Sequence, residues 1–518
     1  DLAGNIRQAS EAGLSGAVAV IEWTDLDHRL GLRASAGWGA AVLEDVVAQS
    51  EEKSRHLETQ LASLGRVTPV VVVGPTLALP PLTYLPPSET SAFELELNSI
   101  LIDFLKRVAR LSGVKVVSGA SLATKSPTAE RHDVKMDLLA GFPYTVSHAD
   151  AVAAMSVKCL FPPVPKKGLI TDLDRTLWSG ILGDAGVDGI SWSLEGKSQA
   201  HALYQQALAS LAESGVLVAV ASKNDAALVN EAFQRADILV KPSHVFPIEA
   251  NWGVKSDGIG RILKAWNIAA DSVVFVDDSP MELAEVAEKY PGMECLPFPV
   301  ENPAAVVALI THLRTRFGKS EVLEEDKLRL QSLRSSASLE EARESEASED
   351  FLARLQAKIT FEASNPLDDK RTFELVNKTN QFNLNGQRYT EAEWKANFER
   401  PGAFLFTVSY TDRFGPLGKI AAVAGRQQEA GLCIVDQWVM SCRAFSRHIE
   451  FETLRHLFAK PDISRLRFRF KPTERNGPLQ SFFQRFFPGA ALGEGDLELT
   501  AAIFERYGSR PLSGNEAH

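Results

Sequence analysis

A short apolar run that ends in two carboxylates constrains the fold of this chain more than any other stretch. Residues 168–170, Gly-Leu-Ile, follow two lysines and lead into Asp172 and Asp174, with Thr176 close behind. A short apolar run bounded by charge is typical of a buried parallel strand, and in an open α/β sheet the chemistry lies just beyond the carboxyl ends of such strands. Two neighbouring carboxylates repel each other unless a cation or a shared proton stabilises them. The run therefore predicts either a Mg²⁺ site or an Asx-type turn.

A second apolar run, 216–221, ends in Ser222, Lys223 and Asn224. A hydroxyl at a strand end can hydrogen-bond a phosphate oxygen. We expect these three side chains and Thr176 to contact the substrate, although Asn224 or Asp225 could instead cap the next helix.

A third run, 272–276, ends in Asp277 and Asp278, and Lys255 stands before a helix that reaches about Trp266. A lysine at this place could neutralise both a carboxylate and a phosphate, whereas a lone lysine is usually solvated. The three strand ends together would supply a nucleophilic carboxylate, an acid/base, a phosphate-binding hydroxyl, a charge-balancing lysine and metal ligands. These groups are the ones required for a nucleophilic substitution at phosphorus that passes through an aspartyl-phosphate intermediate.

Length and composition limit the other possibilities. At 518 residues the chain is too long for one core, and its formal charge of −11 comes without a basic stripe, which argues against nucleic acid as the main partner. The four cysteines show no metal-ligand spacing, and no apolar run approaches the ~20 residues that span a bilayer. We therefore expect a cytoplasmic protein with reduced cysteines and no membrane contact.

In the first part of the chain, apolar runs alternate with patterned helices. The runs 16–23, 69–74 and 114–117 predict buried strands, and the segments 39–64 and 92–112 predict helices between them. Alternating strands and helices indicate an α/β layer. We find no nucleophile elbow and no Gly-rich phosphate loop here, so the sequence of this part indicates no activity by itself.

Two stretches of the last part differ in composition from the rest. The stretch 321–350 is charged and lacks Gly and Pro, which predicts a solvated helical connector. The stretch 371–389 packs amides and lysine around aromatic rings. Such stretches usually form turns and caps, but this one is dense enough to suggest ligand contacts, and we expect Asn380 and Asn383 to contact substrate.

A strand predicted over 432–440 ends at Ser441, Cys442 and Arg443. A cysteine at a strand end beside an arginine, with His448 nearby in sequence, could be a nucleophilic thiolate. A free cysteine is more often simply buried. Both interpretations of Cys442 stay open on the residues alone.

The central motifs resemble those of the haloacid dehalogenase superfamily. Its four motifs match, in chain order, Asp172-x-Asp174-x-Thr176, Ser222, Lys255 and Asp277-Asp278. The resemblance implies a Rossmann-like, doubly wound parallel sheet with Asp172 as nucleophile and Asp174 as general acid/base. It further implies that Asp172, the backbone carbonyl of Asp174 and Asp277 hold Mg²⁺.

The chain as a whole resembles the FkbH-like family of glyceryl-acyl-carrier-protein synthases. The resemblance lies in the segments GFPYTVSHADA, LFPPVPKKGLITDLDRTLW, VNKTNQFNL, YTDRFG, WVMSCRAFSR and PTERNGPL. It implies an N-terminal α/β domain related to SGNH hydrolases, a central haloacid dehalogenase phosphatase domain and a C-terminal α+β domain similar to GNAT acyltransferases. The expected boundaries are 1–165 and 166–315 for the first two domains, 316–350 for the connector and 351–518 for the last domain.

The same resemblance implies a reaction. The family takes 1,3-bisphosphoglycerate, a phosphorylated small-molecule acyl donor, removes phosphate and places the glyceryl group on an acyl carrier protein thiol, in polyketide or polysaccharide biosynthesis. We expect Cys442 to carry the acyl group as a thioester, with Arg443 contacting the substrate. A plain Mg²⁺ phosphohydrolase and a non-catalytic assembly module are the alternatives. The helix after Cys442 lacks a Gly-rich pyrophosphate turn, so we expect no bound acetyl-CoA.

Overall fold

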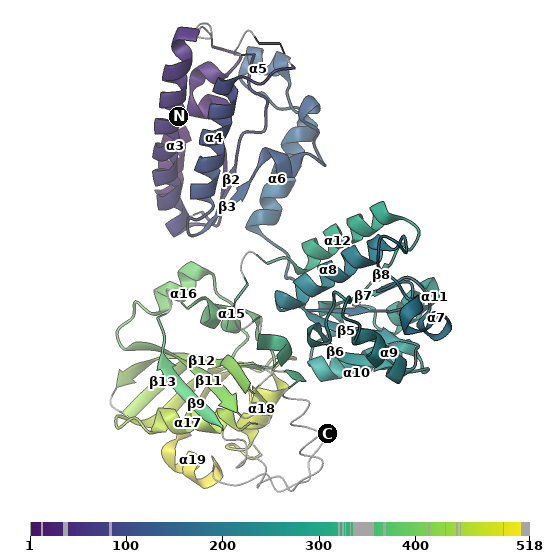
Figure 1. Ribbon diagram of the computed structural model, residues 1–518. Coiled ribbons are helices and arrows are strands. Elements are labelled where there is room, and N and C mark those ends of the chain that lie inside the picture. Colours follow the sequence, from purple (N-terminus) through teal and green to yellow (C-terminus); the bar gives the residue numbers. More distant parts are fainter. Residues whose placement is uncertain are drawn as a thin grey trace. The chain divides into compact units, whose positions relative to one another are not determined.

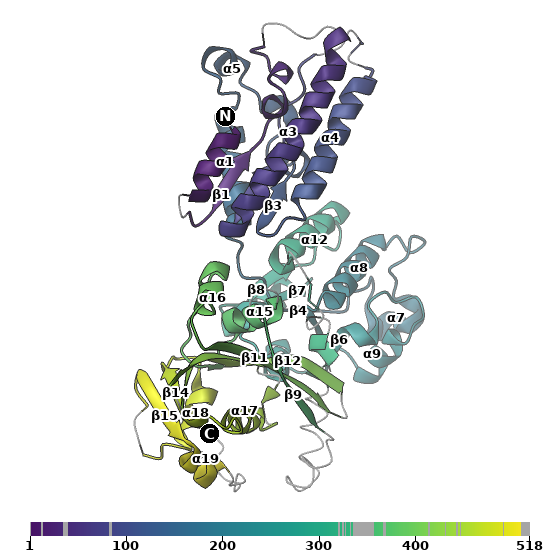
Figure 2. The same cartoon turned by 90° about the vertical axis from the view of Figure 1, so that its left-hand side faces the viewer.

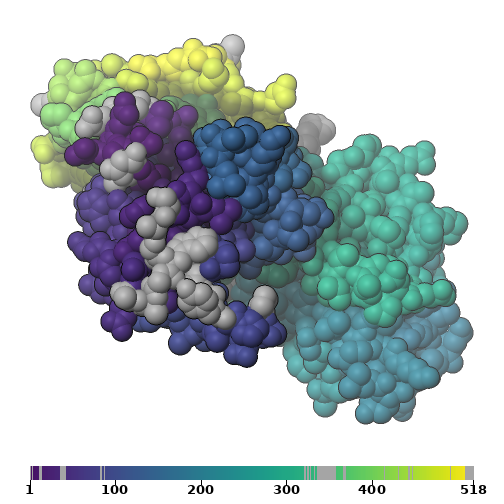
Figure 3. All heavy atoms as spheres, turned by 90° about the horizontal axis from the view of Figure 1, so that it is seen from above, coloured from purple at the N-terminus to yellow at the C-terminus, as the bar shows by residue number. Residues whose placement is uncertain are grey.

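The computed structural model describes most of the chain, whose contacts divide it into two units, 1–164 and 165–518 (Figure 1). Figure 3 shows one outer face of the chain with all heavy atoms drawn as spheres and coloured along the sequence. The described residues are 2–11, 14–34, 40–81, 85–86, 88–319, 322–323, 326, 328–331, 333–334, 357–365, 369–412, 415–429, 431–441, 444–445, 447–489 and 492–508.

A parallel three-stranded sheet forms the centre of the first unit. Its strands, in spatial order, are β1 (Ala17–Val20), β2 (Val70–Val73) and β3 (Val114–Val117). The four valines of β2 are buried and point alternately into two cores, because successive side chains of a strand face opposite sides. One face is covered by α1 (Leu2–Glu11), α3 (Ala40–Val67) and α4 (Ala92–Val108), and the other by α6 (Val146–Leu160) (Figure 1). The predicted α/β layer is confirmed.

A buried polar cluster joins segments at one edge of this sheet. Glu22 follows β1 and precedes the short helix α2 (Trp23–Leu26). Its carboxylate accepts hydrogen bonds from Thr76 N at 3.0 Å, from Thr76 Oγ1 at 2.5 Å and from the Tyr144 hydroxyl at 2.9 Å. Burial raises the pKa of Glu22, and these donors oppose the shift. Tyr144 lies between α5 (Val134–Ala140) and α6, so the cluster connects three segments that are far apart in the sequence.

The second unit contains two sheets, and the first of them is entirely parallel. Its strands, in spatial order, are β6 (Val245–Ala250), β5 (Leu217–Ser222), β4 (Gly168–Thr171), β7 (Val273–Asp277) and β8 (Glu294–Pro297). The chain begins at the middle strand, winds outward to β6 and then continues on the other side through β7 and β8. The strand order therefore reverses at β4, and the doubly wound parallel sheet expected from the sequence is present.

Apolar side chains pack on both faces of this parallel sheet. One face is covered by α8 (Gln199–Glu213), α9 (Ala226–Phe233) and α12 (Pro303–Phe317), and the other by α10 (Lys255–Trp266) and α11 (Pro280–Lys289). Strands buried on both sides need continuous apolar runs, which is why the sequence of these strands is so rich in valine. The packing is close at Gly168, where a Cβ atom would lie 2.4 Å from the ring of Trp266.

Gly and Asp turn signals in the segment 183–192 are consistent with a small hairpin flap, and most of this segment is helical in the structure. Helix α7 spans Leu182–Gly189 and bends at Gly186, whose φ of 70° lies in the left-handed region. Leu182 packs into the core, and its N–H, which has no partner within the first turn of a helix, donates to Asp174 Oδ1 at 3.0 Å. Ser179 and Ser191 pair antiparallel and exchange backbone hydrogen bonds at 2.8 and 3.1 Å, so the ends of the segment close as in a hairpin, with helix α7 between them.

The other sheet of the second unit is mixed. Its strands, in spatial order, are β15 (Gly495–Thr500), β14 (Ile463–Phe470), β13 (Gly431–Met440), β12 (Gly415–Glu429), β11 (Ala403–Asp412) and β9 (Lys358–Ala363). Strands β13 and β14 run parallel and the other neighbours antiparallel, with β11 and β12 forming a hairpin. One face is covered by α15 (Lys370–Lys378) and α16 (Glu391–Asn397), and the other by α17 (Ile449–Phe458), α18 (Gly477–Gln484) and α19 (Ala501–Gly508) (Figure 2).

The parallel pair β13–β14 separates along its length. The register ends at Val435 of β13, and beyond it β13 pairs with the short strand β10 (Phe382–Asn383). Asn385 Nδ2 donates to the carbonyl of Asp436 at 3.0 Å and to the carbonyl of Arg469 at 3.4 Å. A side-chain amide therefore connects the two strands where their backbones no longer pair.

The connector expected at 316–350 lies largely outside the described residues, and its helical prediction is not tested there. In the part of the chain that the structure does describe, every helix is too short or too polar to cross a bilayer.

Candidate active site

The parallel sheet brings four of the predicted site residues to one edge. Asp172 directly follows β4, Ser222 is the last residue of β5, Asp277 is the last residue of β7, and Lys255 is the first residue of α10. The N–H of Asp172 donates to the carbonyl of Val276 at 2.9 Å, which continues the pairing of β4 with β7. The site therefore lies at the carboxyl ends of the strands beside the switch point, where doubly wound folds bind ligands.

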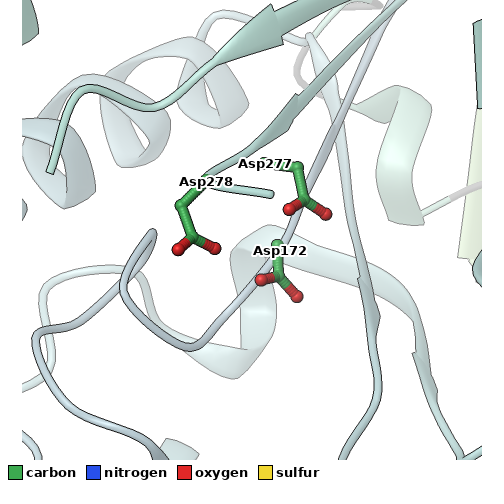
Figure 4. Close-up of side chains that lie close together, drawn as sticks. All are labelled: Asp172, Asp277 and Asp278. Atoms are coloured by element: carbon green, nitrogen blue, oxygen red, sulfur yellow. The ribbon is translucent and has the colours of Figure 1, made fainter. Parts of the chain in front are cut away.

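Three carboxylates gather at this edge, from Asp172, Asp277 and Asp278 (Figure 4). One carboxylate oxygen of each lies within 4.8 Å of the others. Asp172 and Asp277 are 5% and 0% exposed, and Asp278 is half-buried. Like charges this close are unfavourable away from water unless a cation lies among them. Two members of the trio are predicted metal ligands, and Asp278 is a third candidate.

The Lys255 ammonium lies between two of these carboxylates. Its Nζ is 2.6 Å from Asp277 Oδ2 and 3.1 Å from Asp172 Oδ1. Burial alone would lower the pKa of Lys255, but the two carboxylates raise it above its ordinary value. Burial also raises the pKa of Asp172 to about 7, a shift that Lys255 opposes and Asp277 increases. One ammonium cannot neutralise three ionised carboxylates, so the ionised trio keeps a net negative charge.

The donor set fits a magnesium ion. Asp172 Oδ1 is buried, and among the described residues it meets the Lys255 ammonium at 3.1 Å as an ion pair but accepts no well-aligned hydrogen bond. A buried carboxylate oxygen in this state is costly unless a ligand or an ion completes its contacts. Carboxylate oxygens are the donors that hard cations such as Mg²⁺ take, and the trio can hold such an ion. A divalent cation would add the positive charge that Lys255 does not supply and would favour the ionised form of Asp172.

Three donors hold the carboxylate of Asp174, the predicted acid/base. Trp178 Nε1 donates to Oδ1 at 2.9 Å, the N–H of Leu182 donates to Oδ1 at 3.0 Å, and Asn224 Nδ2 donates to Oδ2 at 2.9 Å. The chain turns sharply after Asp174 because Arg175 adopts a left-handed backbone with φ of 57°. The carboxylate lies outside the trio, which leaves the predicted metal contact of this residue to its backbone carbonyl.

The other predicted residues of the central segment lie in different surroundings. Asn224 Nδ2 donates to Ser222 Oγ at 3.1 Å, and both side chains are buried at the end of β5. The Lys223 ammonium pairs with Glu282 Oε1 at 2.6 Å on the first turn of α11. The Thr176 hydroxyl is buried without a hydrogen bond to the described residues. Their contacts with substrate stay predictions.

The predicted substrate residues of the C-terminal sheet take part in hydrogen-bonded turns. Asn383 is buried, and its Oδ1 accepts from the N–H of Asn385 at 3.3 Å. Asn380 Oδ1 accepts from Arg388 Nη2 at 2.5 Å. Both amides therefore help to hold the chain, and a role at the substrate stays a prediction for each.

Cys442 and Arg443, the predicted thioester site, lie outside the described residues. The described cysteines Cys159, Cys295 and Cys433 are free thiols. Burial raises the pKa of Cys433 to about 11, so this cysteine stays protonated at neutral pH and is a poor nucleophile. The thioester role of Cys442 stays a prediction.

Sequence reasoning missed some partners of the site residues. Asp278 could have been assigned as a ligand, because it adjoins Asp277 at the same strand end. The bond from Asn224 to Asp174 joins residues 50 positions apart, and the pair of Lys223 with Glu282 joins residues 59 positions apart. No local pattern in the sequence indicates contacts at such separations.

Comparisons with known proteins give limited information. No family model matches the chain, and neither does any curated protein. Among solved structures, the N-terminal part of the protein BF1531 from Bacteroides fragilis, which contains a phosphatase domain complexed with Mg, is 22% identical. The match covers 59% of this chain and 80% of that one, with a TM-score of 0.46.

Two further solved structures match smaller parts of the chain. One is a domain from Methanocaldococcus jannaschii, at 11% identity and a TM-score of 0.23, over 28% of this chain and 99% of that one. The other is the spermidine/spermine N-acetyltransferase SpeG from Vibrio cholerae, in mutant forms, at 9% identity and a TM-score of 0.21, over 29% of this chain and 98% of that one. With TM-scores this low, the function has to be argued from the chain's own residues.

Proposed function

We propose that the parallel sheet of the second unit carries a Mg²⁺-dependent phosphohydrolase that works through an aspartyl-phosphate on Asp172. One observation carries the proposal. The Lys255 ammonium lies between the buried carboxylates of Asp172 and Asp277 at the carboxyl edge of a doubly wound sheet, 3.1 Å from Asp172 Oδ1 and 2.6 Å from Asp277 Oδ2. A carboxylate held beside an ammonium that can also attract a phosphate oxygen is suited to attack on phosphorus.

The side chains present can serve both halves of such a reaction. In the first half, an Asp172 oxygen attacks phosphorus, the bond from phosphorus to the leaving oxygen breaks, and Asp174 gives its proton to that oxygen. In the second half, Asp174 takes a proton from water, the water oxygen attacks phosphorus, and phosphate leaves with Asp172 restored. The three hydrogen bonds to Asp174 keep its carboxylate in place for both proton transfers.

Lys255 and Ser222 would orient the phosphoryl group. An ammonium beside the nucleophile attracts a phosphate oxygen and offsets the repulsion between two anions. Asp172, Asp277 and Asp278, with the carbonyl of Asp174, would hold Mg²⁺, whose charge stabilises the negative oxygens around phosphorus.

A more specific function is supported by the sequence resemblance. We propose that the phosphorylated substrate is 1,3-bisphosphoglycerate, that Cys442 takes the glyceryl group as a thioester, and that an acyl carrier protein thiol accepts it in the cytoplasm. In that case the units would comprise an SGNH-related domain, a haloacid dehalogenase domain and a GNAT-like domain. A phosphohydrolase without carrier transfer is the alternative.

The chemistry of the acyl donor supports this scheme. The Cys442 thiolate would attack the carbonyl carbon of the acyl phosphate, a carbon–sulfur bond would form, and the carbon–oxygen bond to phosphate would break. Because the donor is already activated, the step needs no ATP. The aspartate centre would then hydrolyse the remaining phosphoester, and the carrier thiol would displace Cys442 from the thioester.

The first experiment measures phosphate release by the full chain from 1,3-bisphosphoglycerate with Mg²⁺, together with the intact mass of the protein. Asp172→Asn should lower Mg²⁺-dependent phosphate release by about a thousandfold or more, because it removes the nucleophile. Asp188→Asn, at an exposed position of α7, serves as the matched control and should have no effect. Unchanged phosphate release by Asp172→Asn would refute the phosphohydrolase proposal.

The mass spectrum tests the more specific function separately. We expect a glyceryl-sized adduct that disappears in Cys442→Ala and persists in Cys159→Ala. An adduct that persists in Cys442→Ala would refute the thioester role. Phosphate release that needs Asp172, without any adduct or mass gain on a carrier protein, would favour the phosphohydrolase alone.

A further inference from the structure

Arg175, in the loop between β4 and α7, has an unusual backbone conformation. Its φ of 57° lies in the left-handed region, where a residue with a side chain is strained. The Arg175 N–H donates to the carbonyl of Gly180 at 3.2 Å, which closes the loop through the backbone alone. A glycine would adopt the same conformation without steric cost. The turn therefore does not account for an arginine side chain at this position.

The Arg175 side chain contacts the carboxylate trio from its solvent side. Arg175 Nε lies 3.5 Å from Asp278 Oδ2, and the arginine side chain is 52% exposed whereas that of Asp278 is 18% exposed. Among the described residues, Arg175 and Lys255 are the cations that form ion pairs with the trio. Lys255 pairs with Asp172 and Asp277, so Arg175 pairs with the one carboxylate that is left.

The charges at this edge determine when the Arg175 guanidinium can take another partner. Without a metal ion, Arg175 and Lys255 leave the three ionised carboxylates with one net negative charge. A divalent cation among the carboxylates changes this to one net positive charge. Because such a cation attracts the same Asp278 oxygens and repels the guanidinium, it weakens the Arg175–Asp278 pair. The edge then has the charge that attracts a phosphate anion, and Arg175 lies on its exposed side.

We propose that Arg175 changes its partner when the site is loaded. In the metal-free protein it pairs with Asp278, and with a divalent cation among the carboxylates its guanidinium binds oxygens of the substrate's phosphoryl group. A guanidinium suits this role because its fork of N–H donors matches two phosphate oxygens. Arg175 would thus act on the phosphoryl group together with Lys255 and Ser222. The inference rests on the proposed function, since it needs a phosphoryl group and a cation at this edge.

This exchange couples the binding of the cation to the binding of phosphate. Without phosphate, Arg175 competes with the cation for Asp278 and weakens cation binding. With phosphate bound to the guanidinium that competition ends, so each ligand strengthens the binding of the other. Removing the guanidinium should therefore tighten the binding of Mg²⁺ alone and weaken the binding of phosphate. A side chain that only supported the loop would affect both ligands in the same direction.

Two calorimetric titrations of the full chain test the proposal, the first with MgCl₂ and the second with inorganic phosphate in saturating Mg²⁺. Arg175→Gln should bind Mg²⁺ alone about two- to fivefold more tightly than the wild type, because it removes a partly exposed competing ion pair. The same variant should bind phosphate about tenfold or more weakly, because it removes a charge-assisted contact. Arg175→Lys, which keeps the charge without the fork, should bind phosphate with an intermediate affinity.

A matched control variant separates this effect from the loss of any surface ion pair. Arg55→Gln removes an exposed pair with Glu51 in the first unit and should match the wild type in both titrations. Unchanged or weaker Mg²⁺ binding by Arg175→Gln would overturn the competition for Asp278. Unchanged phosphate binding by this variant would overturn the contact with the phosphoryl group. Absence of Mg²⁺ binding in the wild type would instead refute the metal site of the proposed function, and the inference with it.

Discussion

Replacing Lys255 with methionine tests the charge balance of the carboxylate trio. The variant keeps an apolar stem in a buried place and removes the ammonium that lies 2.6 Å from Asp277 and 3.1 Å from Asp172. Removing one partner of a buried ion pair typically costs about 3–5 kcal/mol, because an uncompensated charge stays buried. Protonation can relieve part of this cost, since burial already raises the pKa of Asp172 to about 7. We therefore expect Lys255→Met to lower the free energy of unfolding of the metal-free protein by about 3 kcal/mol, near the lower end of this range.

Mg²⁺ should restore most of the stability that Lys255→Met loses. A ligand at a hundredfold of its Kd stabilises a folded protein by about 2.7 kcal/mol. In the variant, Mg²⁺ should bind more tightly than in the wild type, because no ammonium competes for the same oxygens. We therefore expect the difference between variant and wild type to fall to about 1 kcal/mol in saturating Mg²⁺.

Amide hydrogen exchange of β4 and β7 is the suitable measurement, because a chain of two units need not unfold in one step. A loss of about 3 kcal/mol corresponds to exchange that is about a hundredfold faster in EDTA. Lys289→Met is the matched control, since Lys289 pairs with Asp257 on the surface and its loss should leave the exchange unchanged. A loss of equal size with and without Mg²⁺, or no loss in EDTA, would refute the charge argument.

Two further predictions concern stability. Burial alone would raise the pKa of Asp369, but the hydrogen bonds from Lys419, at 2.7 Å, and from its neighbours lower it from 3.8 to about 2. The stabilisation is therefore complete above the ordinary pKa and is lost as the pH falls toward 2. Asp369→Asn should cost about 2 kcal/mol at pH 7 and about half of that at pH 3, measured by exchange of the α15 amides. A loss that does not change with pH would contradict this origin. Gly168→Ala should destabilise the parallel sheet by about 1–3 kcal/mol, because the new Cβ would lie 2.4 Å from the Trp266 ring. The thermal midpoint should fall for this variant but not for Gly183→Ala, whose Cβ would meet nothing within 4 Å, and an equal fall in both would contradict the packing explanation.

The parallel sheet and most of its site could be predicted because the relevant signals are local. Strands buried on both faces need short, continuous apolar runs, and each of these runs ends in the polar side chains that the fold collects at one edge. Asp172, Ser222 and Asp277 could therefore be placed together without knowledge of any long-range contact. Lys255 could be added because it begins the helix that leads into the third strand.

The remaining features depend on contacts between distant residues. Helix α7 forms between the paired residues Ser179 and Ser191, and the Asp174 carboxylate accepts a hydrogen bond from the first N–H of this helix. A small cavity of about 170 Å³ beside Trp394 has walls from a loop, a helix and three strands between residues 387 and 469, and none of these residues is unusual in its local sequence. Its unpaired indole N–H becomes apparent only when hydrogen-bond partners are assigned in three dimensions.

The hydrogen bonds around Asp174 affect what each of the two aspartates, Asp172 and Asp174, would indicate in a related protein that had lost its activity. Asp174 accepts hydrogen bonds from the Trp178 indole, from the Leu182 N–H at the start of α7 and from the Asn224 amide. Replacing it would therefore destabilise the fold even in a protein that no longer catalyses a reaction. Asp172 is different, because its carboxylate is buried beside those of Asp277 and Asp278, and the Lys255 ammonium offsets their repulsion only in part. Selection for folding alone would favour an uncharged residue at 172. An aspartate at 172 is therefore the better marker of a working enzyme, and an aspartate at 174 marks mainly an intact fold.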